Sequence, residues 1–170
     1  MDLTTYIRDI PDFPKPGILF KDITPLLGDP PAFACAIEAM AEAVAELTVT
    51  KLLGIESRGF IFGGALALRT GLGFVPVRKP GKLPFTTIRE TYALEYGQDS
   101  LEIHHDAVKR GERVAVVDDL LATGGTALAA IRLAEKLGAE VAGVVCLVEL
   151  DFLHGREKLE GYRVRSLIHF

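Results

Sequence analysis

The spacing of apolar residues along the chain predicts alternating helices and strands. Between residues 31 and 47, apolar side chains recur at steps of three and four, which places them on one face of a helix. Short apolar runs, typical of buried parallel strands, cover residues 51–55, 73–77, 114–117 and 141–148. A small-residue helix is expected over 60–69, and another over 127–137, closed by Gly138.

The remaining segments are less regular. Leu101 and Ile103 alternate as in a strand, residues 156–159 indicate a short helix, and residues 162–168 a polar edge strand. Because strands alternate with helices and no linker or repeat interrupts them, we expect one domain over residues 1–170. The predicted fold is α/β, with a mostly parallel twisted sheet flanked by helices.

Residues 79–99 break this pattern, since proline, glycine, lysine, threonine and aromatic residues follow one another without a period. Loops of this length in compact domains are commonly active-site lids. We therefore predict a flexible lid loop over about residues 79–99.

Composition narrows the class of protein. The chain of 170 residues has a net charge of −4, 49% hydrophobic and 25% charged residues, as in ordinary soluble proteins. Neither a basic stripe, an apolar run of 18 residues nor a basic N-terminal region is present, so we expect no nucleic-acid partner, no membrane association and a cytoplasmic location. Cys35 and Cys146 lack metal-ligand spacing and indicate buried hydrophobes in a reducing compartment.

The segment Val114–Thr126 carries the most chemistry. Its apolar strand leads into Asp118 and Asp119, then into a loop of hydroxyls and glycines before a helix. Such loops lie at the carboxyl edge of a parallel sheet, where backbone N–H groups and a helix N-terminus bind phosphate. The adjacent carboxylates would repel phosphate and suit sugar hydroxyls or a metal ion, so a phosphorylated sugar is the expected ligand. The alternative is a generic strand–helix turn with a capping threonine.

This segment closely resembles the phosphoribosyl-pyrophosphate signature of the type I phosphoribosyltransferases. The resemblance implies that Asp118 and Asp119 hold the ribose 2′ and 3′ hydroxyls. The residues implied to cradle the 5′-phosphate are Ala122, Thr123, Gly124, Gly125 and Thr126.

Two further polar loops follow predicted strands. In the first, the Ser57 hydroxyl, the Arg58 guanidinium and a helix start can bind an anion, and in the resembling family this is the pyrophosphate loop, with unusual backbone geometry. The resemblance implies pyrophosphate contacts from Glu56, Ser57 and Arg58. A cis peptide near Glu56–Ser57 would be costly and would therefore signal function. The alternative is an ordinary helix start with a solvated arginine.

The second loop carries Arg78, Lys79 and Lys82, whose charges suit the pyrophosphate leaving group. In resembling enzymes such a loop binds pyrophosphate, sometimes across a dimer interface, so Arg78 and Lys79 are candidates for action in trans. The alternative is a solvated basic loop.

Residues 94–97, Leu-Glu-Tyr-Gly, resemble the catalytic loop of the family. The resemblance implies that Glu95 accepts a proton from the incoming base or orients it, and that Tyr96 covers the site. Together with Arg58 these form the predicted catalytic set. The alternative is a surface Glu-Tyr pair.

The proline-rich segment Ile10–Pro25 resembles the opening of adenine phosphoribosyltransferases. An extended backbone can match the hydrogen-bonding edge of adenine, and an aromatic ring can stack on it. The resemblance implies main-chain contacts from Leu19 and Lys21, stacking by Phe20 and packing by Leu120 on the opposite face. Residues 1–30 would then form a base-binding hood. The alternative is a docking strand with Phe20 in the core.

The resemblance spans nearly the whole chain and implies conversion of adenine and phosphoribosyl pyrophosphate to AMP and pyrophosphate by a homodimer. Mg²⁺ is the expected cofactor, held mainly by substrate oxygens and water rather than directly by side chains. His104 and His105 do not suit one metal ion, because adjacent strand residues face opposite ways. Two alternatives stay open: a specificity for xanthine, hypoxanthine or orotate, and a non-catalytic regulator on the same fold.

Overall fold

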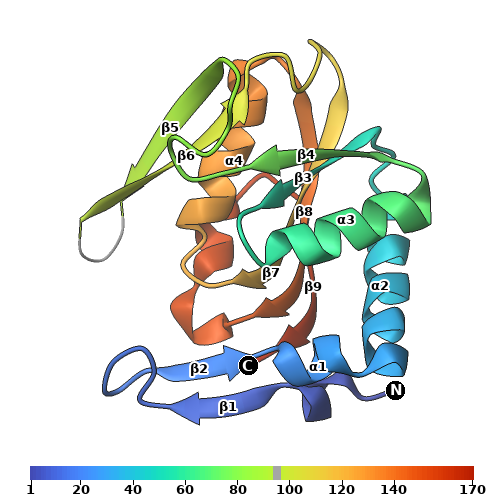
Figure 1. The fold of residues 1–170 in the computed structure, drawn as a ribbon, viewed down its shortest axis with the longest axis vertical. Helices are drawn as coiled ribbons and strands as arrows, with labels where there is room; N and C mark the ends of the chain where they lie inside the picture. Colours follow the sequence, from blue (N-terminus) through green and yellow to red (C-terminus); the bar gives the residue numbers. More distant parts are fainter. Residues whose placement is uncertain (94–96) are drawn as a thin grey trace.

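The computed structural model describes residues 1–93 and 97–170, and it has the predicted α/β architecture (Figure 1). A five-stranded sheet of order β4-β3-β7-β8-β9 forms the middle layer, and all its strand pairs are parallel. Its strands are β3 (Lys51–Ile55), β4 (Gly73–Val77), β7 (Arg113–Leu121), β8 (Glu140–Glu149) and β9 (Val164–His169).

Helices cover both faces of this sheet (Figure 1). On one face α2 (Pro30–Ala45) and α3 (Gly59–Thr70) contribute to one buried cluster, and on the other α4 (Gly125–Lys136) contributes to a second. The central strand supplies both clusters, because Ala115 and Val117 face the first while Val114 and Val116 face the second. The continuous apolar run at 114–117 is explained by this burial on both faces.

Most predicted elements are confirmed with small shifts at their ends. Strands 51–55 and 73–77 have the predicted bounds. The first long helix begins at Pro30 rather than 31, where the Asp29 carboxylate accepts a hydrogen bond from the Ala32 backbone N–H at 2.9 Å. Gly138, with φ +83°, follows α4 in the left-handed conformation expected of a helix-closing glycine.

One boundary differs with a consequence for the site. The central strand does not end before the two aspartates but continues to Leu121, because β8 is long enough to keep pairing with it: Asp118 lies opposite Cys146 and Leu120 opposite Val148. The carboxylates therefore project from a strand rather than from a loop.

The irregular loop expected over 79–99 is confirmed only in part. Residues 79–86 form turns and coil, but β5 (Thr87–Ala93) and β6 (Gln98–His104) form an antiparallel hairpin. The period of two was obscured by Glu90, whose carboxylate is largely buried and lies 2.5 Å from Lys136 Nζ of α4. Glu95 and Tyr96 lie outside the described residues.

The N-terminal segment forms η1 (Leu3–Tyr6), a hairpin of β1 (Arg8–Pro11) and β2 (Leu19–Asp22), and α1 (Thr24–Gly28). This hairpin lies near the C-terminal ends of β8 and β9 (Figure 1). Two short 3₁₀ helices, η2 (Asp151–Leu153) and η3 (Gly155–Leu159), connect β8 to β9. Within the described part of the chain, no helix combines the length and the apolar character that a membrane crossing requires.

Candidate active site

A cavity of about 270 Å³ opens at the carboxyl ends of β3 and β7. This is where parallel α/β sheets bind ligands, because the loops between strands and helices meet there. Its lining consists of residues 55–58, 118–124, 126 and 127, together with Lys79, Tyr92 and Cys146. Residues from β3, the basic loop, β5, the β7–α4 segment and β8, which are distant in the sequence, thus share one cavity.

Residues 122–124 connect β7 to α4, and together with Thr126 in the first turn of α4 they form one wall of the cavity. Gly124 adopts φ +78° and precedes the helix, so the helix N-terminus and its free N–H groups face the cavity side of the loop. A side chain at Gly124 would place its Cβ 2.2 Å from the carbonyl oxygen of Gly155, so only glycine fits. The loop can bind a phosphate through its backbone.

Gly155 packs directly against this loop, a contact that the sequence did not predict. A Cβ at this position would meet the Ala122 carbonyl oxygen at 2.1 Å, so η3 supports the loop by direct backbone contact. The contact joins residues more than 30 positions apart, and no local pattern in the sequence indicates it.

Asp118 and Asp119 are largely buried at the cavity. Burial raises the pKa of Asp118 well above its ordinary value, and the charge of Asp119 adds to the rise. Burial also raises the pKa of Asp119, although Arg58, whose Nε lies 2.9 Å from Asp119 Oδ2, opposes it. Desolvated carboxylates of this kind are strong acceptors for hydroxyl groups that enter the cavity.

Gly59 makes this arrangement possible. A Cβ on Gly59 would lie 2.7 Å from Asp118 Oδ1, so glycine lets the start of α3 approach the carboxylate closely. The peptide bond between Glu56 and Ser57 is cis, an unusual backbone geometry of the kind that the resembling family often has at this loop. Ser57 and Arg58 line the cavity beside the aspartates.

Glu56 lines the cavity, and its carboxylate pairs with the basic loop. Its carboxylate lies 2.5 Å from Lys82 Nζ and 3.2 Å from Arg78 Nη2, and it accepts a hydrogen bond from the Lys79 backbone N–H at 2.9 Å. Burial raises the pKa of Glu56, but these three contacts outweigh burial and lower it to about 2. Within the described residues, the side chains of Arg78 and Lys82 do not line the cavity, because they pair with this glutamate.

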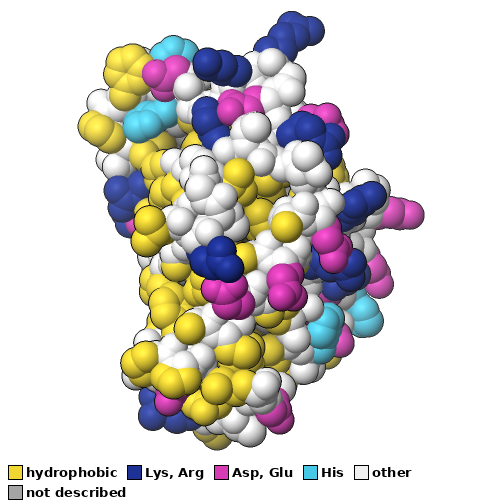
Figure 2. All heavy atoms as spheres, turned by 90° about the vertical axis from the view of Figure 1, so that its right-hand side faces the viewer, with side chains coloured by type: hydrophobic (Ala, Val, Ile, Leu, Met, Phe, Trp, Pro, Cys, Tyr) yellow, Lys and Arg dark blue, Asp and Glu magenta, His cyan; other side chains and the backbone are white. Residues whose placement is uncertain are grey.

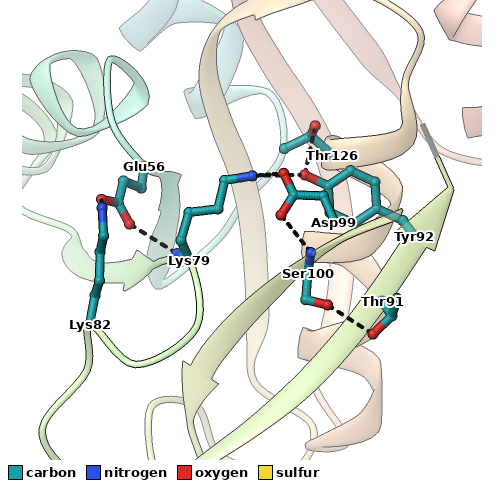
Figure 3. Close-up of polar contacts among 8 residues, drawn as sticks. All are labelled: Glu56, Lys79, Lys82, Thr91, Tyr92, Asp99, Ser100 and Thr126. Atoms are coloured by element: carbon teal, nitrogen blue, oxygen red, sulfur yellow. Dashed lines mark hydrogen bonds and ion pairs between the residues drawn. The ribbon is translucent and has the colours of Figure 1, made fainter. Parts of the chain in front are cut away.

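Lys79 is the cation of the basic loop that does line the cavity of its own chain. Its ammonium contacts the Asp99 carboxylate and lies 3.4 Å from the Tyr92 hydroxyl, which in turn accepts a hydrogen bond from Thr126 Oγ1 at 3.4 Å (Figure 3). The hairpin β5–β6 therefore connects the basic loop to the phosphate loop. Tyr92 and Asp99 were missed from the sequence, since the hairpin itself was not predicted.

The residues predicted to hold the base lie on β2 of the N-terminal hairpin and, in the case of Leu120, on β7. Phe20 contacts the site through Arg58, whose guanidinium carbon is 5.2 Å from the ring centroid, and Leu120 lines the cavity. Lys21 is only 8% exposed, because its ammonium lies 2.6 Å from Asp9 Oδ1 and 3.7 Å from the ring centroid of Phe170. The side chain of Lys21 is thus held by contacts within the protein.

The side chains at the cavity offer few free carboxylate oxygens, which suits a metal ion bound mainly to the oxygens of a ligand in the cavity and to water. Asp119 is paired with Arg58 and Glu56 with the basic loop, so few carboxylate oxygens remain for direct coordination. Within the part of the chain that the structure describes, the group of three possible ligands is Glu149, Asp151 and His169, and Arg156 already binds Glu149 at 2.9 and 2.5 Å. Mg²⁺ commonly binds in this way, through substrate phosphates and water.

Comparison with known proteins defines the class. The family model described as Phosphoribosyl transferase domain matches residues 26–169, which include the whole cavity. The chain is therefore a phosphoribosyltransferase. It is 58% identical to the adenine phosphoribosyltransferase of Desulfitobacterium hafniense (strain Y51), over 100% of this chain and 98% of the relative.

Solved structures agree with this assignment. The adenine phosphoribosyltransferase of Thermoanaerobacter pseudethanolicus superposes with a TM-score of 0.97 at 56% identity, over 99% of this chain and 98% of that one. The Saccharomyces cerevisiae enzyme, complexed with D-2,5-dideoxy-2,5-imino-altritol 1,6-bisphosphate and adenine, gives a TM-score of 0.91 at 45% identity, over 98% and 96% of the two chains. The chain belongs to the adenine phosphoribosyltransferase family.

Proposed function

We propose that this enzyme transfers the 5-phosphoribosyl group from phosphoribosyl pyrophosphate to N9 of adenine, giving AMP and pyrophosphate. The observation that carries the proposal is one cavity in which a phosphate-binding loop, an aspartate pair and two cations meet. Each matches a different part of the donor: the 5′-phosphate, the ribose hydroxyls and the pyrophosphate. The high identity to adenine phosphoribosyltransferases supports the choice of base.

The donor is held at two points on the β7–α4 segment. Backbone N–H groups of residues 122–126 and the N-terminus of α4 would bind the 5′-phosphate dianion. Asp118 and Asp119 would accept hydrogen bonds from the ribose hydroxyls. These hydrogen bonds would offset the free-energy cost of burying the two carboxylates. The two anchors fix the ribose C1 relative to the base, which lowers the entropic cost of the reaction.

Charge stabilisation comes from the opposite wall. As the bond between ribose C1 and the pyrophosphate oxygen breaks, positive charge develops on the ribose and negative charge on pyrophosphate. Arg58 and Lys79, with Ser57, lie where they would stabilise the leaving group, and this contribution to catalysis is commonly large. Arg78, Lys82 and Glu56 would hold the loop that carries Lys79 rather than touch the anion themselves.

Mg²⁺ would neutralise part of the pyrophosphate charge when bound, held through substrate oxygens and water. Adenine would lie between Phe20 and Leu120, with its hydrogen-bonding edge against the backbone of Leu19 and Lys21. Glu95 remains the candidate for accepting or orienting the N9 proton, and Tyr96 the candidate for covering the site.

The substrate is tested by steady-state pyrophosphate release with Mg²⁺ and phosphoribosyl pyrophosphate. Adenine, hypoxanthine, guanine, xanthine and orotate are offered separately, and excess EDTA serves as a control. We expect turnover with adenine, with at least about 100-fold lower kcat/KM for the oxo-bases, because a buried hydrogen-bonding edge left unmatched is costly. Turnover with an oxo-base instead would overturn the base assignment, and tight donor binding without any turnover would favour a regulator.

We also propose that the enzyme is a homodimer that assembles through α3 and the neighbouring β4. Ile61, Leu68 and Phe74 are exposed apolar side chains on these elements, and Leu68 is 88% exposed. Figure 2, which views the molecule from the side on which α2 and α3 lie, shows hydrophobic side chains gathered over much of that face. Contiguous apolar surface of this kind usually marks an interface, and self-association is the commonest arrangement.

Substituting Leu68 by glutamate should shift the protein to monomers, because a charge would be buried at the centre of the interface. We expect the dimer dissociation constant to rise by at least about 100-fold, measured by sedimentation velocity. Phe152→Glu is the matched control, since Phe152 is 63% exposed on η2. Equal dissociation constants for Leu68→Glu and the unmodified protein would place the interface elsewhere.

A further inference from the structure

Lys79 lines the cavity, and its ammonium forms an ion pair with Asp99 of the β5–β6 hairpin. Its ammonium contacts Asp99 at the start of β6 and lies 3.4 Å from the Tyr92 hydroxyl of β5 (Figure 3). The remaining cations of the loop, Arg78 and Lys82, pair with Glu56 on the other side of the backbone. The three cations thus pair with two carboxylates, and Asp99 pairs with Lys79, the cation that lines the cavity.

Asp99 is itself held in place. Its Oδ1 accepts a hydrogen bond from the Ser100 backbone N–H at 2.7 Å, and the Ser100 hydroxyl lies 2.9 Å from that of Thr91 across the hairpin. Asp99 pairs with Tyr92 in the β5–β6 register, so the carboxylate and the hydroxyl face Lys79 together (Figure 3). The arrangement is a fixed acceptor rather than a chance surface contact.

The side chains remain accessible enough to exchange partners, since that of Lys79 is 37% exposed and that of Asp99 is 31% exposed. Burial opposes both charges, but the pair outweighs it: the pKa of Asp99 is lowered and that of Lys79 is raised. Both groups are therefore charged at neutral pH, and an anion that enters must compete with Asp99 for the ammonium.

We propose that Asp99 is a positioning residue that competes with pyrophosphate for Lys79. The inference rests on the proposed role of Lys79 in binding pyrophosphate. Pyrophosphate carries several negative charges and displaces the single carboxylate, so its attraction to the ammonium is partly offset by the loss of the Lys79–Asp99 pair. Asp99 thereby weakens product binding and takes back the ammonium when pyrophosphate leaves.

The experiment measures the dissociation constant of pyrophosphate, in the presence of Mg²⁺, by calorimetry on the full-length protein. We expect Asp99→Asn to lower this constant about 3- to 10-fold, and Lys79→Met to raise it at least about 10-fold. In the Lys79→Met background, Asp99→Asn should change it by less than about twofold, because no ammonium remains to compete for. The inhibition constant of pyrophosphate against phosphoribosyl pyrophosphate should follow the same order.

Glu90→Gln is the matched control, since it removes a negative charge from the same hairpin on the side facing Lys136. It should leave the dissociation constant unchanged. Weaker pyrophosphate binding in Asp99→Asn would overturn the proposal, as would the same tightening in both backgrounds, which would mean general repulsion without competition. An unchanged constant in Lys79→Met would instead remove Lys79 from the proposed pyrophosphate site.

Discussion

Asp118→Asn is expected to lower turnover by at least about 100-fold while making the protein more stable at neutral pH. An amide can occupy nearly the same space, but it lacks the negative charge that strengthens hydrogen bonds from ribose hydroxyls as positive charge develops. Its neutrality also removes a desolvated charge beside Asp119. We expect a gain of about 1–2 kcal/mol in the free energy of unfolding.

The stability gain should depend on pH in a defined direction. Because the pKa of Asp118 is raised in the folded state, the native protein binds more protons than the unfolded chain above the ordinary value of 3.8. The destabilisation due to Asp118 is therefore absent below about pH 4 and complete above its folded pKa. Thermal unfolding should show a higher Tm for the variant at neutral pH and equal values near pH 3.5.

Glu140→Gln serves as the control for this pair of measurements. Glu140 pairs with Arg113 at the opposite end of the same strands and is well exposed, so neither turnover nor Tm should change appreciably. A variant at Asp118 that kept turnover within about threefold would remove the ribose-binding role, and one that lost stability at neutral pH would show that the carboxylate is not under strain from burial.

Gly155→Ala is expected to impair donor binding although the residue lies outside the signature loop. Its Cβ would lie 2.1 Å from the Ala122 carbonyl oxygen and 2.9 Å from the Gly124 backbone nitrogen. Both are backbone atoms, which cannot rotate away as a side chain could. The phosphate loop must shift, so we expect at least about a 10-fold rise in the KM for phosphoribosyl pyrophosphate. Overpacking of this kind should also lower the free energy of unfolding by about 2–3 kcal/mol.

Steady-state kinetics and urea denaturation check both parts of this expectation. Gly28→Ala is the matched control, because an added Cβ there meets no atom within 4 Å and the backbone is not in the left-handed region. The KM for adenine should change less than that for the donor, since the loop is proposed to bind the 5′-phosphate of the donor. Unaltered donor kinetics in Gly155→Ala would show that η3 does not support the loop.

The predictions that succeeded concern short segments whose conformation follows from their own residues. The strand over 73–77 and the closing glycine at 138 have the predicted conformation, because a short apolar run and a glycine directly after a helix are local signals. The strand, acidic pair, glycine loop and helix of residues 114–126 likewise form one contiguous unit around the cavity.

The hairpin over 87–104 shows where this reasoning failed. Ile88, Glu90 and Tyr92 do alternate, but a glutamate among them disguised the pattern, and its partners Lys136 and Arg132 lie on a helix about 40 residues away. A charged residue reads as solvent-facing until its partner is known, so the sequence indicated an irregular loop instead.

From the sequence alone came the class of fold, the strands of the central sheet with the long helices that flank them, and the segment 114–126 that lines the cavity, because these depend on neighbours along the chain. Only the tertiary structure decided which cation of the basic loop reaches the cavity, because the sequence does not distinguish Arg78, Lys79 and Lys82. In the structure Arg78 and Lys82 pair with Glu56, whereas Lys79 pairs with Asp99. It likewise decided that Gly155 supports the phosphate loop. Such contacts join strands and helices far apart in sequence, and their distances are set by how those elements pack.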